Sequence, residues 1–201
     1  TLSSSSAASD VYKRQVSSPQ GVIAVARPVD RPWHDLVAAL PSDGAVTVAV
    51  CERLQDPGNA GLVLRTADAA GASAVFFGED SADVFAPKVV RASAGSVLSV
   101  PLARKVPVLD LLNALHERGI RIAATSPYGD SDLFAAPTAA RTAWVFGNEA
   151  QGLEDTTMNA CDSVVRIPLF GRAESLNLAT AATLCLFESA RAHGEREASA
   201  R

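Results

Sequence analysis

Asn59 and Arg65 are the first residues along the chain whose types and spacing could do chemistry. They belong to the segment CERLQDPGNAGLVLRTADAAGA, in which residues 56–58 predict a turn and Asn59 is placed to cap a helix that begins at Ala60. A guanidinium carried by this helix could bind a phosphate or a reacting oxygen. The alternative is a surface arginine beside a capping asparagine, and the spacing alone favours this alternative.

A second polar group follows the apolar segment TAWVF. Gly147 and Gly152 flank it, and because they lack side chains the backbone there can approach a ligand closely. Glu149 comes directly after the predicted strand, where we expect it to have little contact with solvent. The segment contains neither GxxxxGK[ST] nor GxGxxG, so it does not predict a phosphate-binding loop. A polar turn without a function is an equal alternative.

The third segment is SVVRIPLFGRAESLNLATAATLCLFESA, which combines an extended apolar loop with a helix start. Free backbone groups in the loop could bind the edge of an adenine. Ser175 and Asn177 are predicted to open a helix that is apolar nearly all round over residues 178–187, which indicates burial in a core or a subunit interface. Glu174 and Ser175 could both be simple capping residues, but this reading does not explain Asn177.

The composition bounds the class of protein. The chain has 201 residues, of which 48% are hydrophobic, so we expect one domain of about 150 residues with short appendages. A net charge of −4 argues against a protein that coats nucleic acid through bulk charge, although a local basic site remains compatible with it. No apolar run reaches the roughly 20 residues needed to cross a membrane and the N-terminus lacks a signal pattern, which predicts a cytoplasmic protein.

The cysteines and histidines do not show the paired spacing of metal ligands or of a disulfide framework. We therefore predict no metal site and reduced, buried thiols. The residues concerned are Cys51, Cys161, Cys185, His34, His116 and His193.

The three segments described above must be positioned by a folded domain, and the pattern of apolar residues predicts the class of that domain. Short apolar runs alternate with helical patterns, which predicts an α/β domain with a mainly parallel sheet flanked by helices on both faces. In such sheets, ligands bind beyond the carboxyl ends of the strands. The predicted strands cover residues 45–51, 73–77, 99–102, 120–125, 142–147 and 163–168, and the predicted helices cover 60–70, a stretch from about 87, 108–118, a short stretch after 152, and 175–192.

Four segments are predicted along the chain. Residues 1–15 are Ser-rich and aperiodic, so they are interpreted as a non-native or disordered tail. Residues 16–44 contain a short apolar strand at 21–26 followed by a proline-containing linker. Residues 45–192 form the domain with the three chemical segments, and residues 193–201 are expected to be a flexible C-terminal tail.

Taken together, NAGLVLRTADAAGA, FGNEAQGL and IPLFGRAESLNLATAA closely resemble the three signature motifs of the SpoU (TrmH-like) branch of the SPOUT methyltransferases. The resemblance spans residues 45–191. It implies transfer of a methyl group from S-adenosylmethionine to a ribose 2′-hydroxyl of RNA, with ribosomal RNA favoured over transfer RNA. It also implies a C-terminal deep trefoil knot and a homodimer formed through the knot region and the last helix. Residues 16–44 then resemble the remnant of an L30e-like RNA-binding domain plus a linker.

The same resemblance assigns residues to the site. The cofactor-binding set comprises Thr125, Gly147, Gly152, Ile167, Leu169, Ser175 and Leu176, and the catalytic set comprises Arg65, Asn59, Glu149, Ser175 and Asn177. Arg65 is expected to stabilise the developing alkoxide, with Asn59 and Glu149 orienting it and the ribose, while Asn177 holds the site together. Nearby basic residues could contact the RNA backbone or form ordinary solvated surface; they are Lys88, Arg91, Arg104, Lys105 and Arg172.

Two other classes of protein share the same strand and helix rhythm. One is a nucleotide- or NAD-binding Rossmann protein, which the absence of GxGxxG disfavours. The other is an RNA-binding module on the same fold in which the catalytic residues are retained but idle.

Overall fold

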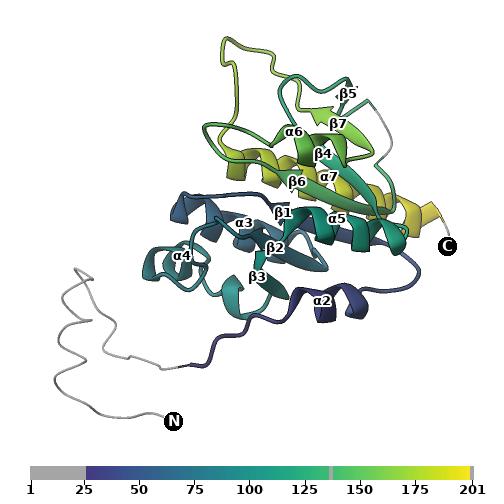
Figure 1. The fold of residues 1–201 in the computed structure, drawn as a ribbon. Coiled ribbons are helices and arrows are strands. Elements are labelled where there is room, and N and C mark those ends of the chain that lie inside the picture. The colour runs from purple at the N-terminus through teal and green to yellow at the C-terminus, as the bar shows by residue number, and fades with distance from the viewer. Residues whose placement is uncertain (1–25, 136–137, 200–201) are drawn as a thin grey trace.

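A computed structural model describes residues 26–135 and 138–199 of the chain. These residues form a seven-stranded sheet with helices on both faces (Figure 1). The predictions for residues 1–15, and for nearly all of the strand expected at 21–26, lie outside the described residues.

The strands run in the order β3-β2-β1-β6-β4-β7-β5, and every neighbouring pair is parallel. Their carboxyl ends therefore all lie at one edge of the sheet, and the predicted α/β class with a mainly parallel sheet is confirmed. The trefoil knot stays a prediction. The strands are β1 (Val46–Cys51), β2 (Ala74–Gly78), β3 (Leu102–Val106), β4 (Arg121–Thr125), β5 (Ser131–Asp132), β6 (Arg141–Phe146) and β7 (Ser163–Arg166).

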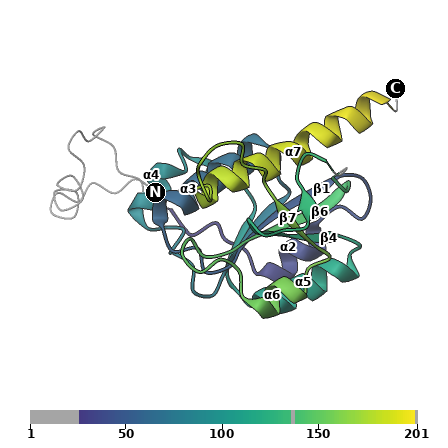
Figure 2. The same ribbon diagram turned by 90° about the horizontal axis from the view of Figure 1, so that it is seen from above.

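The helices divide between the two faces of the sheet, as Figure 2 shows. One face is covered by α3 (Pro57–Ala69), α4 (Pro87–Ala92) and α7 (Leu178–Ser199). The other is covered by α2 (Trp33–Ala39), α5 (Val108–Glu117) and α6 (Asp155–Asn159). No helix in the described part of the chain is long and apolar enough to cross a membrane.

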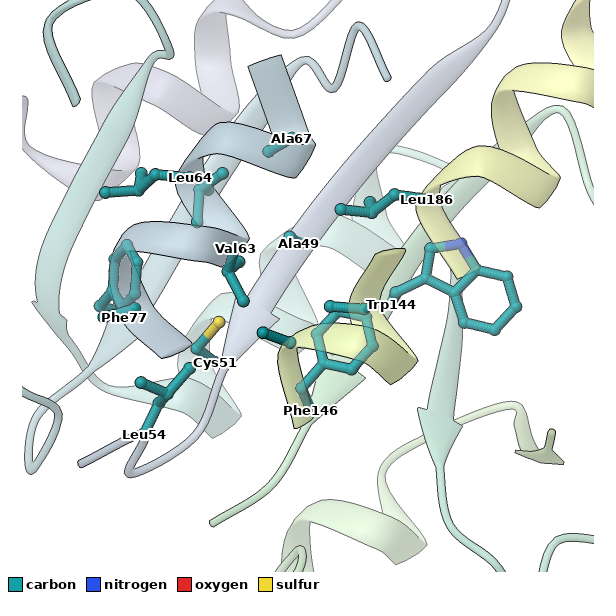
Figure 3. Packing of buried hydrophobic residues seen from close by; sticks show 14 of the residues in the cluster. Ala49, Cys51, Leu54, Val63, Leu64, Ala67, Phe77, Trp144, Phe146 and Leu186 are labelled. Atoms are coloured by element: carbon teal, nitrogen blue, oxygen red, sulfur yellow. The ribbon is translucent and has the colours of Figure 1, made fainter. Parts of the chain in front are cut away.

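The core under α3 and α7 fixes the helix that carries the first segment. Val63 and Leu64 of α3 are fully buried against Cys51 of β1, and Leu186 of α7 packs into the same cluster (Figure 3). β1 is buried along its whole length because both of its faces are covered, which is typical of a parallel sheet. The indole N–H of Trp144 in β6 donates to the Ser189 hydroxyl at 2.9 Å, which ties α7 to the sheet.

Part of the segment predicted as a linker is a packed helix. Leu36 and Val37 of α2, with Leu40 directly after it, are buried against the second face of the sheet. The prediction of a linker through residue 44 is therefore wrong for residues 33–40, whereas residues 41–44 are exposed and irregular. The reason is that apolar side chains spaced at i, i+1 and i+4 give even a short helix one face to bury.

The last helix differs from the prediction at both ends. It begins at Leu178 rather than Ser175 and continues to Ser199, so the flexible tail expected from residue 193 is wrong over that stretch. Arg191 pairs with Glu188 and Glu195 one turn away on either side, and such pairs stabilise an exposed helix. Phe187 is 47% exposed, so the helix is not buried all round in the single chain. In Figure 2 its C-terminal half projects beyond the sheet.

Candidate active site

The three chemical segments meet at the carboxyl edge of the sheet. The first follows β1, the second follows β6, and the third connects β7 to α7. β1 pairs with β6 in register, with Cys51 opposite Phe146, so the loops after these two strands leave the sheet side by side. Figure 1 shows the segment between β7 and α7 standing out from the body of the domain as a long loop.

The start of α3 differs from the prediction in a way that matters for the site. Asp56 is the N-cap, and its carboxylate accepts a hydrogen bond from the backbone N–H of Asn59 at 2.8 Å. Pro57 is the first helical residue, a position that proline favours. Asn59 therefore lies inside the first turn instead of capping the helix. Its side-chain amide is free to bond elsewhere.

Asn59 joins the three segments through its side chain. Its Nδ2 donates to Glu149 Oε1 at 3.1 Å, and its Oδ1 accepts from Asn177 Nδ2 at 2.9 Å. An asparagine amide offers one acceptor and two donor positions, so it can bridge a carboxylate and a second amide at once. Residues up to 118 positions apart in sequence are in this way linked in one hydrogen-bonded cluster.

Glu149 binds the backbone of the first segment as well as Asn59. Its carboxylate accepts from the backbone N–H of Asp56 at 3.0 Å and of Gln55 at 3.3 Å. Burial raises the pKa of Glu149, but the hydrogen bonds from Asn59 and from backbone N–H groups outweigh it, and the net pKa lies below the ordinary value. The expectation that Glu149 has little solvent contact is wrong for the single chain, because its side chain is exposed.

The pKa of Glu149 leads to a prediction about stability. A carboxylate whose folded pKa is lowered stabilises the fold above its unfolded pKa of about 4.3, and this contribution is lost as the pH falls through the folded pKa. Glu149→Gln should therefore lower the free energy of unfolding at pH 7 by less than about 1 kcal/mol, since the group is exposed and screened. The difference from the wild type should shrink at pH 3.

Urea unfolding of both proteins at the two pH values measures this difference. Glu174→Gln is the control, because Glu174 is exposed and makes no hydrogen bond or ion pair within the described residues. A Glu149→Gln deficit that is as large at pH 3 as at pH 7 would contradict the assignment.

Asn177 has two roles in the structure. Its Oδ1 accepts from the backbone N–H groups of Ala179 at 2.9 Å and Thr180 at 3.2 Å, which is the geometry of an N-cap. It therefore lies just before α7, not inside it as predicted. Because its Oδ1 faces the helix, its Nδ2 can donate to Asn59. The start of α7 is thus fixed to the start of α3.

The loop of the second segment closes on itself. Asn148 and Gly152 exchange two backbone hydrogen bonds of 2.8 and 2.9 Å, and Asn148 Oδ1 accepts from Ala150 and Gln151 within the turn. Gly152 adopts φ 71°, a conformation that favours glycine. A Cβ on Gly147 would lie 2.2 Å from the carbonyl carbon of Gly152. Both glycines are therefore required by the loop itself, whatever it binds.

The third segment leaves much of its backbone unpaired. Within the described residues, residues 167–176 make no hydrogen bond through backbone or side chain. Ile167 and Leu169 are half-buried, whereas Ser175 and Leu176 are exposed. Thr125, at the end of neighbouring β4, donates its hydroxyl to the carbonyl of Val145 at 3.0 Å. Ser175, predicted in both sets, is not part of the hydrogen-bonded cluster.

The side chain of Arg65 is exposed and makes no hydrogen bond or ion pair with any described residue. The prediction that Asn59 and Glu149 orient it is not seen in the single chain. The reason is helical geometry: Asn59 and Arg65 both lie in α3, six residues apart, so they are separated by about 120° around the axis and about 9 Å along it.

The candidate RNA-contacting residues are not all available. Arg104 pairs with Asp30 at 2.7 Å and Asp83 at 3.5 Å, and its guanidinium lies 5.0 Å from the centre of the Phe85 ring. Lys88 lies 3.8 Å from the Asp56 carboxylate. The other three candidates are exposed and have no such partner in the described part of the chain; they are Arg91, Lys105 and Arg172.

The surroundings of the three thiols disfavour the reactive thiolate form. Cys51 and Cys185 are buried and free, and burial raises the pKa of both. Burial and the nearby Asp162 and Glu52 carboxylates raise the pKa of Cys161 to about 12. Among the described residues, no three His, Cys, Asp or Glu side chains are grouped as metal ligands.

Comparison with known proteins decides the family. The sequence model described as the SpoU rRNA Methylase family matches residues 46–187, which include the motifs NAGLVLRTADAAGA, FGNEAQGL and IPLFGRAESLNLATAA. The chain belongs to this family. The SpoU match ends within α7 and does not include α2.

Individual SpoU relatives agree with the match. The chain is 36% identical over 174 residues to "Uncharacterized tRNA/rRNA methyltransferase slr1673" of Synechocystis sp., with 87% of this chain and 61% of the relative covered. It is 38% identical over 180 residues to the 23S rRNA (uridine(2479)-2′-O)-methyltransferase of Streptomyces viridochromogenes, again with 87% and 61% covered. The chain thus spans about three fifths of the length of these relatives.

A solved structure shares the fold. The AdoMet-bound rRNA methyltransferase from Sinorhizobium meliloti is 35% identical and superimposes with a TM-score of 0.72, covering 81% of this chain and 60% of that one.

Proposed function

We propose that this chain transfers a methyl group from S-adenosylmethionine to a ribose 2′-hydroxyl of RNA. The observation that carries the proposal is the cluster of Glu149, Asn59 and Asn177, which joins all three SpoU segments at the carboxyl edge of the sheet. This edge is where ligands bind in open α/β sheets. The name of the Streptomyces relative supports the 2′-O position as the target.

The residues present fit S-adenosylmethionine as the cofactor. Residues 167–176 carry backbone N–H and C=O groups without partners in the described chain, and adenine and ribose edges require such groups. Ile167 and Leu169 would supply apolar contact to the adenine, with Thr125, Gly147, Gly152, Ser175 and Leu176 completing the pocket. When bound, the cofactor supplies an electrophilic methyl group on a sulfonium.

Arg65 is proposed to act on the ribose rather than on the cofactor. A guanidinium keeps its proton at neutral pH, so Arg65 is a poor base for the 2′-hydroxyl proton. It can instead stabilise the negative charge that develops on the 2′-oxygen, with an RNA phosphate accepting the proton. Its exposure and lack of partners leave the guanidinium free for RNA.

Ribosomal RNA is the proposed substrate, since the Streptomyces relative is named for 23S rRNA. Transfer RNA is the second candidate, because the Synechocystis relative is named as a tRNA/rRNA methyltransferase. We also propose that the protein is located in the cytoplasm, where the ribosomal and transfer RNAs of such relatives are processed.

A homodimer completes the proposal. Leu62 of α3 is 40% exposed and Phe187 of α7 is 47% exposed, on two helices that pack against each other. Large apolar side chains exposed on neighbouring elements are typical of a protein interface. Arg65 lies one turn from Leu62 in α3, so a partner on this face would lie beside the proposed catalytic arginine.

Methyl transfer tests the proposal directly. The purified chain is incubated with S-adenosylmethionine carrying a labelled methyl group and with ribosomal or transfer RNA. We expect label in RNA and resistance of the modified position to alkaline cleavage, because a 2′-O-methyl group removes the attacking hydroxyl. RNA binding without methyl transfer would indicate an idle RNA-binding module instead. Binding of NAD in place of S-adenosylmethionine would indicate a Rossmann-type enzyme.

A further inference from the structure

Glu52 is a buried carboxylate to which the proposed reaction assigns no role. It directly follows β1 and is 5% exposed. Its Oε2 accepts from the backbone N–H of Glu154 at 3.0 Å, and its Oε1 accepts from the Thr157 hydroxyl. Its own backbone N–H donates to the carbonyl of Phe146, the last residue of β6, at 2.8 Å. Glu52 therefore binds both ends of the loop formed by residues 147–153.

Arg53 binds the same loop between its ends. Its guanidinium pairs with Glu154 at 3.0 Å and donates to Gln151 Oε1 at 3.3 Å, while its carbonyl accepts from Asn148 Nδ2 at 2.9 Å. The backbone of Arg53 has φ 51°, which is strained for a residue with a side chain. Such a conformation persists where surrounding contacts impose it, and it is common near functional sites.

The loop held in this way carries the residues on which the site depends. Glu149 at its tip binds Asn59, and the hydrogen-bonded pair of Asn148 and Gly152 forms its closed base. Moving the loop would displace Glu149 and the backbone that borders the proposed cofactor pocket. Glu52 and Arg53 do not serve only to cap α6. This helix has only five residues, and Arg53 contacts mainly the loop that precedes it.

We infer that Glu52 and Arg53 are positioning residues that hold residues 147–153 in the shape the cofactor pocket needs, so that affinity for S-adenosylmethionine depends on them. This inference rests on the proposed function. Neither residue belongs to the proposed catalytic set or to the proposed cofactor-binding set. Their effect is expected on cofactor affinity and not on the turnover rate at saturating cofactor.

Arg53→Gly separates positioning from simple stabilisation. It relieves the backbone strain and removes the guanidinium at the same time. If Arg53 were only structural, stability and cofactor affinity would change together. We expect thermal stability to be retained while the Kd for S-adenosylmethionine, measured by calorimetry, rises about tenfold, equivalent to about 1.4 kcal/mol. Turnover at saturating cofactor should change little.

Ala94→Gly is the matched control. Ala94 is exposed, has φ 50° and lies after α4, away from the loop. The substitution relieves the same kind of strain, and its Kd should equal that of the wild type.

Glu52→Gln is the second variant. It keeps the size of the side chain but turns an amide N–H₂ toward donors that now need an acceptor, so it too should raise the Kd. Amide hydrogen exchange of residues 147–153 is measured without cofactor for both variants, and it should be faster than in the wild type.

The outcomes are distinguishable. If the wild type does not bind S-adenosylmethionine, the proposed function fails, and the exchange data still decide whether the two residues hold the loop. If the wild type binds and both variants bind equally well with unchanged exchange, the inference is overturned.

Discussion

Arg65→Ala is expected to abolish methyl transfer to RNA while leaving the affinity for S-adenosylmethionine unchanged. Removing one preorganised donor to a developing oxyanion commonly costs about a hundredfold to a thousandfold in rate, and we expect a loss of at least this size. Cofactor affinity should persist because Arg65 is outside the hydrogen-bonded cluster and is proposed to contact the ribose of the RNA, not the cofactor. Loss of the Arg65 side chain should not harm the fold, since this side chain makes no hydrogen bond or ion pair within the described residues.

Two measurements on each variant check the division of roles: calorimetry with the cofactor and labelled methyl transfer to RNA. Arg121→Ala is the control, because Arg121 is an exposed arginine at the opposite edge of the sheet, where β4 begins. It should transfer methyl groups at the wild-type rate. An Arg65→Ala variant that loses cofactor binding and methyl transfer equally would contradict a role on the ribose.

The fold class was predictable because its causes are local. Apolar runs bounded by turn residues predict strands, and β1, β2, β4 and β6 lie within about two residues of the predicted ranges. The third strand was misplaced: residues 99–102 were predicted, whereas β3 is Leu102–Val106. Only Leu102 falls in both ranges, because the real strand contains Arg104 and Lys105 and is apolar mainly at its start. Edge strands with charged residues give weak apolar signals.

The position of β6 between β1 and β4 was not predictable from the pattern. Strand periodicity describes each strand alone, whereas the order in a sheet depends on long-range pairing. This order is what places the second segment beside the first, and so allows Glu149 to reach Asn59.

The sequence predicted which residues belong to the candidate site, but it did not predict the contacts that they make. The pair Asp56 and Pro57 was interpreted as a turn, although an acidic N-cap followed by proline at the first helical position is itself a helix-start signal. This error placed Asn59 at the cap of α3 instead of in its first turn. Glu52 and Arg53 were missed because their partners lie about a hundred residues away.

Gly147→Ala is expected to be among the most damaging small substitutions at the site. A Cβ there would lie 2.2 Å from the carbonyl carbon of Gly152, 2.5 Å from its oxygen and 2.4 Å from the backbone nitrogen of Leu153. These are backbone atoms held by the paired hydrogen bonds of Asn148 and Gly152, so no side chain can rotate to make room. Overpacking of this kind commonly costs about 1–3 kcal/mol, and the loop must open to accept the methyl group.

The expected opening of the loop distinguishes Gly147→Ala from a substitution that only lowers the stability of the protein. Its cofactor affinity should fall at temperatures where the protein is still folded, because the Asn148 and Gly152 pairing shapes the proposed pocket. Urea unfolding and calorimetry with S-adenosylmethionine measure the two effects.

Two other glycines provide graded controls for Gly147→Ala. Gly171→Ala should be neutral in stability, since a Cβ there meets nothing within 4 Å. Gly152→Ala also meets nothing within 4 Å but has φ 71°, so it should cost about 1 kcal/mol through strain alone. If Gly147→Ala were as stable as Gly171→Ala and bound the cofactor as well as the wild type, the loop could not have the closed shape on which the cluster of Glu149, Asn59 and Asn177 depends.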